Sequence, residues 1–244
     1  MPKDIFSTQA SLYAQYRPTY PAELYDFIYS RLAGFDAAWD CATGNGQVAV
    51  ELAKRFDKIY ATDISDKQLS NAPALPNILY SNQQAEHTTF ADNTFDLITV
   101  GQALHWFKHD AFFAEVKRVL KPGGVFAAWM YDVLTVNPAI DEHFTHFYHH
   151  TTNLYWEPER KFVDAHYTTI HFPFDSVERA EFTMSVQWTL SHFEGYLNTW
   201  SATQKMIAQT GQNPVPALVA QLQPLWGLDE VKEVTFPVYL VVGF

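Results

Sequence analysis

A short stretch near the start of the chain carries the residue types of a nucleotide-binding turn. Residues 38–53 read as a buried strand that ends near Asp40, a tight turn through Gly44 and Gly46, and then a helix. Glycines let the backbone approach a ligand closely, and a helix N-terminus presents unpaired N–H groups. The stretch therefore predicts a site for a nucleotide-like ligand.

A second acidic residue strengthens this prediction and leaves two interpretations open. Asp63 follows Gly44 by 19 residues at the end of a second expected strand, where its carboxylate can accept both ribose hydroxyls of an adenosine. The glycines together with Ala49 fit the G-x-G-x-x-A pattern of dinucleotide-dependent oxidoreductases. However, Asp40 lies four residues before Gly44, which fits a different pattern, D-x-G-x-G-x-G, with Ala42 in place of the first glycine.

The elements that must position these residues alternate along the first half of the chain. Strand-like runs alternate with amphipathic helical runs, and Ser65 is the expected N-cap of the helix that follows Asp63. This order predicts an α/β fold with a doubly wound, mostly parallel sheet. The other expected strands are residues 77–81, 97–100 and 125–129, and helices are expected over residues 22–32 and 111–120.

The chain changes character from about residue 135. Aromatic and histidine residues become frequent, a strand is expected through residues 182–188, and one helix is expected over residues 190–209. Another helix opens near Pro214, and residues 231–242 read as a last strand with a proline kink. We therefore expect one domain over residues 1–244, with an N-terminal helical lid, a ligand-binding core, a cap or substrate region that contributes one core strand, and a last strand. The expected bounds are residues 1–35, 36–131, 135–225 and 231–243.

Composition limits the classes of partner. The 244 residues are 48% hydrophobic and carry a formal net charge of −11, which disfavours nucleic acid and anionic membranes as partners. Cys41 is the only cysteine, so an internal disulfide and a thiol-based zinc site are excluded. No apolar run approaches membrane-spanning length and no signal pattern opens the chain, so a cytoplasmic location is expected. The expected oligomeric state is a monomer or a homodimer.

Several motifs now stand in an order that resembles a known family. After the glycine turn and Asp63 come Ala85-Glu86, then Phe95-Asp96-Leu97-Ile98, and then Leu120-Lys121-Pro122-Gly123-Gly124. This order is similar to the class I S-adenosylmethionine-dependent methyltransferases, in particular the type 11 group that acts on small molecules. The segments 16–21 and 102–106 resemble the trans-aconitate and juvenile-hormone-acid methyltransferase relatives. The resemblance implies a seven-stranded sheet with an antiparallel C-terminal strand and a helical cap.

The resemblance also implies S-adenosylmethionine as cofactor and a role for individual residues. The glycine turn would pass beneath the methionyl-ribose part, Asp63 would bind the ribose hydroxyls, and Asp40 would lie near the amine of the cofactor. The Gln102 carbonyl would contact that amine, the Ala85 N–H would meet adenine, and Arg17 would pair with the cofactor carboxylate. The full implied set is Tyr13, Arg17, Asp40, Ala42, Gly44, Gly46, Asp63, Ile64, Gln84, Ala85, Glu86 and Gln102.

His105 and Trp106 are the predicted catalytic residues. By the same resemblance they follow the fourth strand and face the transferable methyl group. Methyl transfer from a sulfonium is an in-line displacement in which positioning and water exclusion supply most of the rate. A carboxylate acceptor needs no general base, whereas a hydroxyl or amine acceptor needs one, for which His105 is the candidate. Aromatic residues expected to form the acceptor pocket are Trp106, Trp129, Phe144, Tyr148 and Trp156.

Three alternatives remain at this stage. A nicotinamide-dependent oxidoreductase is disfavoured by Asp40 and by the absence of a Tyr-x-x-x-Lys pair, and a non-catalytic binder of the cofactor is a second alternative. His143, His146 and His150 share one face of an expected helix, which would allow a metal site. Because no cysteine accompanies them, we expect an aromatic- and histidine-rich cap helix and no metal. The predicted partner is a small-molecule acceptor.

Overall fold

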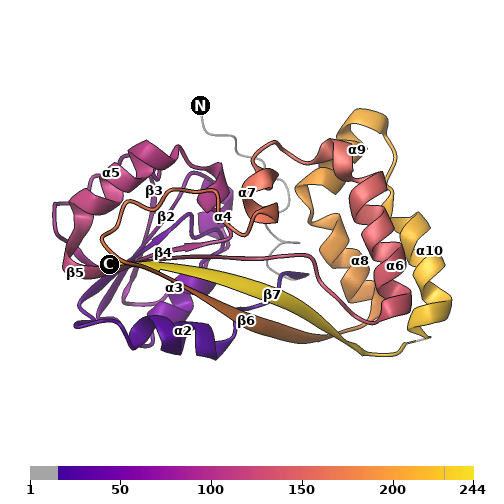
Figure 1. The fold of residues 1–244 in the computed structure, drawn as a ribbon, viewed down its shortest axis with the longest axis horizontal. Helices are drawn as coiled ribbons and strands as arrows, with labels where there is room; N and C mark the ends of the chain where they lie inside the picture. Colours follow the sequence, from indigo (N-terminus) through magenta and orange to yellow (C-terminus); the bar gives the residue numbers. More distant parts are fainter. Residues whose placement is uncertain (1–15, 228) are drawn as a thin grey trace.

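A computed structural model describes residues 16–227 and 229–244, and it shows a sheet with helices on both faces and a group of helices beyond one end (Figure 1). The seven strands are ordered β3-β2-β1-β4-β5-β7-β6. All neighbouring pairs are parallel except those of β7, which runs antiparallel between β5 and β6. The predicted doubly wound sheet with an antiparallel C-terminal strand is confirmed.

The seven strands of the sheet lie between residues 37 and 243 of the chain. They are β1 (Ala37–Cys41), β2 (Lys58–Asp63), β3 (Ile78–Asn82), β4 (Phe95–Gly101), β5 (Leu120–Tyr131), β6 (Val177–Trp188) and β7 (Lys232–Gly243). In β1 and β4 nearly every residue is buried, as expected for parallel strands covered on both faces. Strand β5 is longer than predicted, because it also includes the Lys121–Gly124 segment that we expected only to end a helix.

Helices cover both faces of the sheet. In the first half of the chain these are α2 (Ala22–Tyr29), α3 (Gln47–Leu52), α4 (Asp66–Ser70), the short 3-10 turn η2 (Leu104–Trp106) and α5 (His109–Val119). The face covered by α5 holds an aromatic core of Trp39, Phe95, Phe112 and Phe126, each with no exposed surface. The opposite face packs α2 and α3 against the sheet, and its core continues into the group of helices at the end of the molecule.

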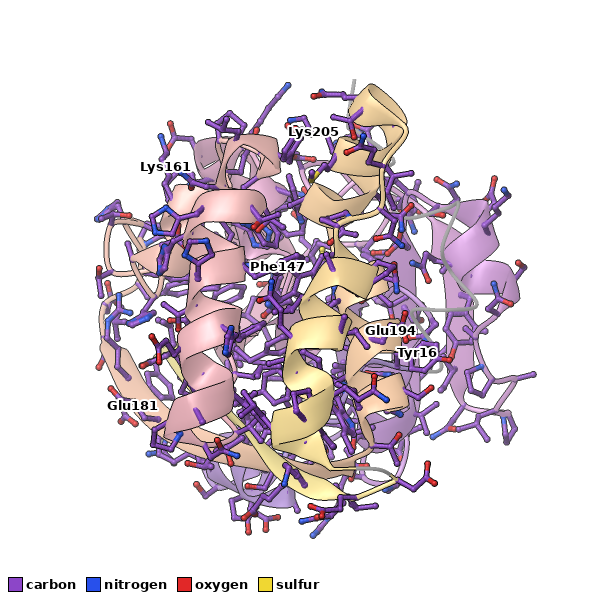
Figure 2. All side chains as sticks on the ribbon, turned by 90° about the vertical axis from the view of Figure 1, so that its right-hand side faces the viewer. Tyr16, Phe147, Lys161, Glu181, Glu194 and Lys205 are labelled. Carbon is purple, nitrogen blue, oxygen red and sulfur yellow. The ribbon has the colours of Figure 1, made fainter. Side chains whose placement is uncertain are left out.

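The second half of the chain forms that group. It contains α6 (Pro138–His146), the π-helical turn η3 (Phe147–Thr151), η4 (Asn153–Tyr155), α7 (Arg160–Asp164), α8 (Leu190–Asn198), α9 (Ser201–Thr210) and α10 (Val215–Trp226). Helices α6 and α10 lie side by side, and α10 also contacts α8 (Figure 2). The long strands β6 and β7 join this group to the sheet, while α7 lies between the two (Figure 1).

The predicted single helix over residues 190–209 is wrong, because the chain breaks between α8 and α9. Trp200 adopts an extended backbone conformation (φ −70°, ψ 135°) ahead of α9. The preceding Thr199 donates its hydroxyl to the Tyr196 carbonyl at 2.6 Å and accepts a hydrogen bond from Arg17 Nε at 3.0 Å. A long-range contact with Arg17 therefore accompanies the break, and helical periodicity alone does not reveal it.

Candidate active site

A cavity of about 780 Å³ opens at the carboxyl ends of the central parallel strands. Parallel α/β sheets bind ligands at this edge, where the strand order reverses between β1 and β4. The cavity brings together eleven of the predicted residues from turns far apart in the sequence. These are Asp40, Ala42, Gly44, Asp63, Ile64, Gln84, Ala85, Glu86, Gln102, His105 and Trp106.

Asp63 is fixed at the end of β2 by backbone donors. Its Oδ2 accepts a hydrogen bond from the Gly44 N–H at 2.9 Å, and its Oδ1 accepts one from the Ser65 N–H at 2.9 Å. Ser65 in turn caps α4 by accepting from the Gln68 N–H at 3.3 Å, which confirms the predicted N-cap. The carboxylate is thus oriented at the rim of the cavity before any ligand binds.

The two glycines of the turn serve different purposes. Both have left-handed backbones, with φ of +57° at Gly44 and +83° at Gly46. A Cβ at Gly44 would meet open space, whereas a Cβ at Gly46 would lie 2.5 Å from the Tyr80 hydroxyl oxygen. Gly44 therefore leaves room for a ligand, while Gly46 lets the turn pass close to Tyr80 and does not itself line the cavity.

Asp40 is a buried carboxyl group at the base of the cavity. Only 1% of the residue is exposed, and its carboxylate accepts hydrogen bonds from the hydroxyls of Thr43 and Thr99. Burial disfavours the charged form and raises the pKa of Asp40 to about 7, although the two hydroxyl donors oppose the shift. A cationic group of a ligand in the cavity would stabilise the carboxylate.

Gln84, Ala85 and Glu86 also line the cavity. Glu86 Oε1 also accepts a hydrogen bond from the Lys108 N–H at 3.0 Å, at the N-cap position of α5. Glu86 therefore lines the cavity and also holds the start of α5 in place.

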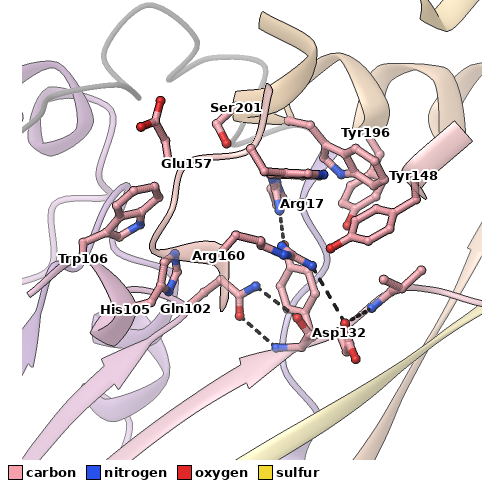
Figure 3. A pocket seen from close by; sticks show the side chains of 14 residues that line it. Arg17, Gln102, His105, Trp106, Asp132, Tyr148, Glu157, Arg160, Tyr196 and Ser201 are labelled. Carbon is pink, nitrogen blue, oxygen red and sulfur yellow. Dashed lines mark hydrogen bonds and ion pairs between the residues drawn. The ribbon is translucent and has the colours of Figure 1, made fainter. Parts of the chain in front are cut away.

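A smaller cavity of about 70 Å³ adjoins the large one, and both share a wall of Gln102, His105 and Trp106 (Figure 3). Gln102 has a left-handed backbone (φ +57°), and its side-chain amide pairs with the backbone N–H and C=O of Tyr131 at 2.8 and 3.1 Å. The pairing holds the chain in a conformation that is otherwise costly for a residue with a side chain.

His105 lies deep in the shared wall. It is 7% exposed, and its Nδ1 lies 3.2 Å from the Tyr167 hydroxyl oxygen. Burial, with the positive charge of Arg160 as a second cause, lowers the pKa of His105 to about 3. The imidazole is therefore neutral at physiological pH, and it is a weak base.

Arg160 places a positive charge in the smaller cavity. Its guanidinium lies over the rings of Trp156 and Tyr148, 4.7 and 5.4 Å from their centroids. Its Nε donates to Asp164 Oδ1 at 3.0 Å, and its Nη2 lies 3.8 Å from Asp132 Oδ1. Figure 3 shows this guanidinium in the middle of the cavity, between the shared wall and Tyr148.

Arg17 lines the smaller cavity and not the larger one. Its side chain donates to the Tyr131 hydroxyl and to Thr199, and it lies over the Tyr196 ring at 5.1 Å. These contacts hold the guanidinium at the break between α8 and α9, and its expected pairing with the cofactor carboxylate stays a prediction. Tyr13 lies outside the described residues.

Two of the five aromatic residues expected around the acceptor are in the core instead. Trp129 and Phe144 have no exposed surface, and Trp129 packs edge-on against Tyr20. Trp106, Tyr148 and Trp156 do line the smaller cavity. Aromatic content alone did not distinguish a core position from a pocket position.

Two of the three cap histidines lie next to each other. The α-helix ends at His146, and His150 lies in the π-helical turn that follows. The rings of His146 and His150 lie 4.6 Å apart. Within residues 16–227 and 229–244, no three potential metal ligands gather in one place.

The sequence analysis missed several residues of both cavities. Tyr131, Asp132, Tyr196, Trp200 and Arg160 line the smaller cavity, and Tyr167 supports His105 from behind. Tyr20, Gln68, Lys108, Glu159 and Phe162 line the larger one. Tyr20 belongs to segment 16–21, which carries part of the resemblance. The other residues come from segments that the tertiary fold brings to the site.

Comparison with known proteins agrees with this geometry. The family described as a methyltransferase domain matches residues 39–128. A Dictyostelium discoideum protein named as a candidate methyltransferase is 32% identical over 248 residues, covering 98% of this chain and 94% of that protein. The structure of a candidate type II methyltransferase from Anaeromyxobacter dehalogenans has 34% identity and a TM-score of 0.85, covering 93% of this chain and 97% of the other.

A more distant structure shares the fold alone. The phosphoethanolamine N-methyltransferase 2 of Haemonchus contortus, solved with S-adenosylhomocysteine and phosphomonomethylethanolamine, is 18% identical with a TM-score of 0.51. The match covers 96% of this chain and 57% of that one.

The relatives decide between the two glycine patterns, in favour of the one that includes Asp40. The residues present fit the corresponding cofactor, since the space above Gly44 is open and Asp63 is already oriented at the rim. The chain belongs to the class I S-adenosylmethionine-dependent methyltransferases.

Proposed function

We propose that this enzyme transfers a methyl group to an oxygen atom, of a carboxylate or a hydroxyl, on a small molecule bound in the smaller cavity. The observation that carries the proposal is the shared wall of Gln102, His105 and Trp106, which borders both cavities. An in-line displacement needs donor and acceptor on opposite sides of one transfer point. Two adjoining cavities with a common wall supply that arrangement.

The size and chemistry of the smaller cavity support a small acceptor. At about 70 Å³ it holds roughly a tenth of the space of the larger cavity, so a large acceptor would have to displace the side chains of the cap. The net charge of −11 disfavours nucleic acid. The likeness of segments 16–21 and 102–106 to trans-aconitate and juvenile-hormone-acid methyltransferases supports an oxygen acceptor.

We assign the binding roles by position around the larger cavity. Asp63 accepts the ribose hydroxyls, Asp40 and the Gln102 carbonyl lie toward the methionyl amine, and Gln84 with Ala85 borders the adenine. The bound cofactor supplies an electrophilic methyl group on a sulfonium, which already is a good leaving group. The aromatic walls exclude water and suit a transition state in which charge is dispersed.

Calorimetry with S-adenosylmethionine, S-adenosylhomocysteine and NAD tests the cofactor site. We expect the first two to bind and NAD not to bind. Asp63→Asn keeps the shape of the side chain but loses one acceptor and the charge, so affinity for S-adenosylmethionine should fall about 10- to 100-fold. Asp57→Asn, at the exposed position before β2, is the matched control and should leave affinity unchanged.

Transfer of a tritiated methyl group into a mixture of small metabolites tests the acceptor class. Incorporation into low-mass compounds supports the proposal. Binding of the cofactor without incorporation into any small molecule, or incorporation into protein or nucleic acid instead, would contradict it.

A further inference from the structure

We propose that Tyr167 holds His105 with its proton on Nε2, so that His105 donates a hydrogen bond to the acceptor, and that the acceptor group is a carboxylate. The inference rests on the proposed function and narrows it. It makes His105 a donor that positions the acceptor, in place of the general base considered from the sequence.

The hydrogen bond of the Tyr167 hydroxyl fixes the direction of its proton. Tyr167 has no exposed surface, and within residues 16–227 and 229–244 its hydroxyl has one hydrogen-bond partner, His105 Nδ1, 3.2 Å away. A buried hydroxyl proton needs an acceptor, so the Tyr167 O–H donates to Nδ1. A neutral imidazole carries one proton, so when Nδ1 accepts, the proton lies on Nε2.

The segment that carries Tyr167 is held rigidly. His166 and Tyr167 both have left-handed backbones, with φ of 49° and 55°, a conformation that persists only where the surroundings impose it. His166 pairs with Asp132 Oδ2 at 2.8 Å and stacks on Tyr239 with ring centroids 3.9 Å apart. Tyr167 itself has no exposed surface. These contacts keep the hydroxyl in place behind His105.

The cavity on the far side of His105 suits an anion. Arg160 is close enough for its charge to lower the pKa of His105, and its guanidinium lines the same small cavity. An N–H donor and a guanidinium on adjoining walls match the two oxygens of a carboxylate. The rings of Trp156 and Tyr148 flank the guanidinium and leave an apolar surface for the body of the acceptor.

A hydroxyl or amine acceptor would need a base that the cavity does not offer in a free state. The Nδ1 lone pair of His105 is directed at Tyr167. Of the two carboxylates that line the cavity, Asp132 bonds to His166 at 2.8 Å and Glu157 bonds to Lys205 at 2.8 Å. A carboxylate acceptor avoids the requirement, because it reacts in its ionised form.

The step balances without a proton transfer. An acceptor oxygen forms the new O–C bond with the methyl carbon while the C–S bond breaks, and the electron pair of that bond stays on sulfur. The negative acceptor and the positive sulfonium become a neutral methyl ester and a neutral thioether. Nothing is oxidised or reduced, and no base is consumed.

The tautomer is measured directly by ¹⁵N NMR of histidine-labelled protein bound to S-adenosylhomocysteine. The chain has ten histidines, so the signal of His105 is identified by its loss in His105→Gln. We expect Nδ1 to be unprotonated and Nε2 protonated across the neutral range. A proton on Nδ1, or an imidazolium at neutral pH, would overturn the assignment.

Substitutions separate a donor from a base. A glutamine amide reaches about as far as Nε2 and donates a hydrogen bond, but it cannot take up a proton. His105→Ala should lower kcat about 100-fold, and His105→Gln should recover at least tenfold of that loss, with a flat pH profile. Equal losses in both variants, with a wild-type rate that rises with pH, would show a base instead.

Tyr167→Phe removes only the hydroxyl that sets the tautomer. We expect a fraction of His105 to carry its proton on Nδ1 in the NMR spectrum and kcat to fall severalfold, with the affinity for S-adenosylmethionine unchanged. Tyr60→Phe, on β2 where the ring packs against Phe90 and Phe95, is the matched control and should change neither. An unaltered His105 spectrum in Tyr167→Phe would contradict the role given to the hydroxyl.

The product identifies the acceptor class. Methyl esters release volatile methanol in alkali, whereas methyl ethers and methylamines do not, so tritiated products from the metabolite mixture are treated with base. As defined probes, trans-cinnamate is compared with cinnamyl alcohol and cinnamamide for binding to the complex with S-adenosylhomocysteine. Alkali-labile counts and preference for the acid support the inference, while alkali-stable products or preference for the alcohol or amide overturn it. Failure of the proposed function differs, since then the cofactor does not bind or no small molecule is labelled.

Discussion

Ala42 holds a backbone conformation that costs an alanine more than a glycine. It follows β1 with φ of +54°, at the position where the pattern expects its first glycine. Left-handed backbone costs a residue with a Cβ about 1–2 kcal/mol, and glycine in return loses about 0.5–1 kcal/mol of chain entropy on folding. Ala42→Gly should therefore raise the free energy of unfolding by about 0.5 kcal/mol in urea denaturation.

A control substitution, Ala53→Gly at the end of the next helix, should lower the free energy of unfolding. Ala53 follows α3 with an ordinary helical φ of −62°. Glycine there adds the loss of chain entropy on folding and removes no backbone strain, so Ala53→Gly should destabilise the protein by about 1 kcal/mol. Destabilisation of similar size in both variants would show that Ala42 is not strained.

At the scale of single residues, the sequence predicted more of the residues that line the larger cavity than of those that line the smaller one. Asp40, Gly44 and Asp63 lie in or beside one local motif. The geometry of a strand followed by a tight turn restricts the positions that these residues can take. Arg160 and Tyr167 reach the site only because α7 and the segment after it fold back over η2. Their positions depend on long-range packing, which no spacing in the sequence encodes.

At the scale of elements, the break between α8 and α9 depends on hydrogen bonds of one buried threonine. Thr199 has no exposed surface, and its hydroxyl both donates to Tyr196 and accepts from Arg17. Thr199→Val keeps the shape and removes both bonds, so it should lower the free energy of unfolding by about 1–3 kcal/mol. The measurement compares the midpoints of urea denaturation of the variant and the wild type, with the dependence of the unfolding free energy on urea concentration unchanged.

Thr203 on α9 provides a matched control with the opposite expectation. It is equally buried, and its hydroxyl has no hydrogen-bond partner in the described part of the chain. Thr203→Val removes an unsatisfied polar group and should be neutral or stabilising by up to about 1 kcal/mol. If both variants lose equal stability, the loss reflects valine in a helix and not the hydrogen bonds at the break.

At the scale of the whole molecule, the alternation of strands and helices was enough to predict the sheet, and the arrangement of the cap was not. Parallel order follows from right-handed crossovers once the strands are known. The position of the cap depends on the length of β6 and β7, which extend past the other strands of the sheet. Helices α6, α8 and α10 lie at the far end of these two strands (Figure 1). No helix among residues 16–227 and 229–244 combines the length and apolarity that crossing a membrane requires.

Asp40 links the cofactor cavity to the stability of the whole fold through pH. Its pKa is about 7 in the folded protein and near 3.8 in the unfolded chain, so between these values the folded state binds more protons. Stability therefore falls as pH rises from about 4 to about 7, and the total loss is of the order of 4 kcal/mol at 1.36 kcal/mol per pKa unit.

Asp40→Asn, which stays neutral and is similar in shape, should lack this pH dependence. The difference between the unfolding free energies of the two proteins, measured by urea denaturation, should therefore widen toward neutral pH and then level off. Asp57→Asn, at an exposed position, should follow the wild type throughout. If the unfolding free energies of the wild type and Asp40→Asn change in parallel from pH 4 to pH 8, Asp40 is not the group whose protonation makes stability depend on pH.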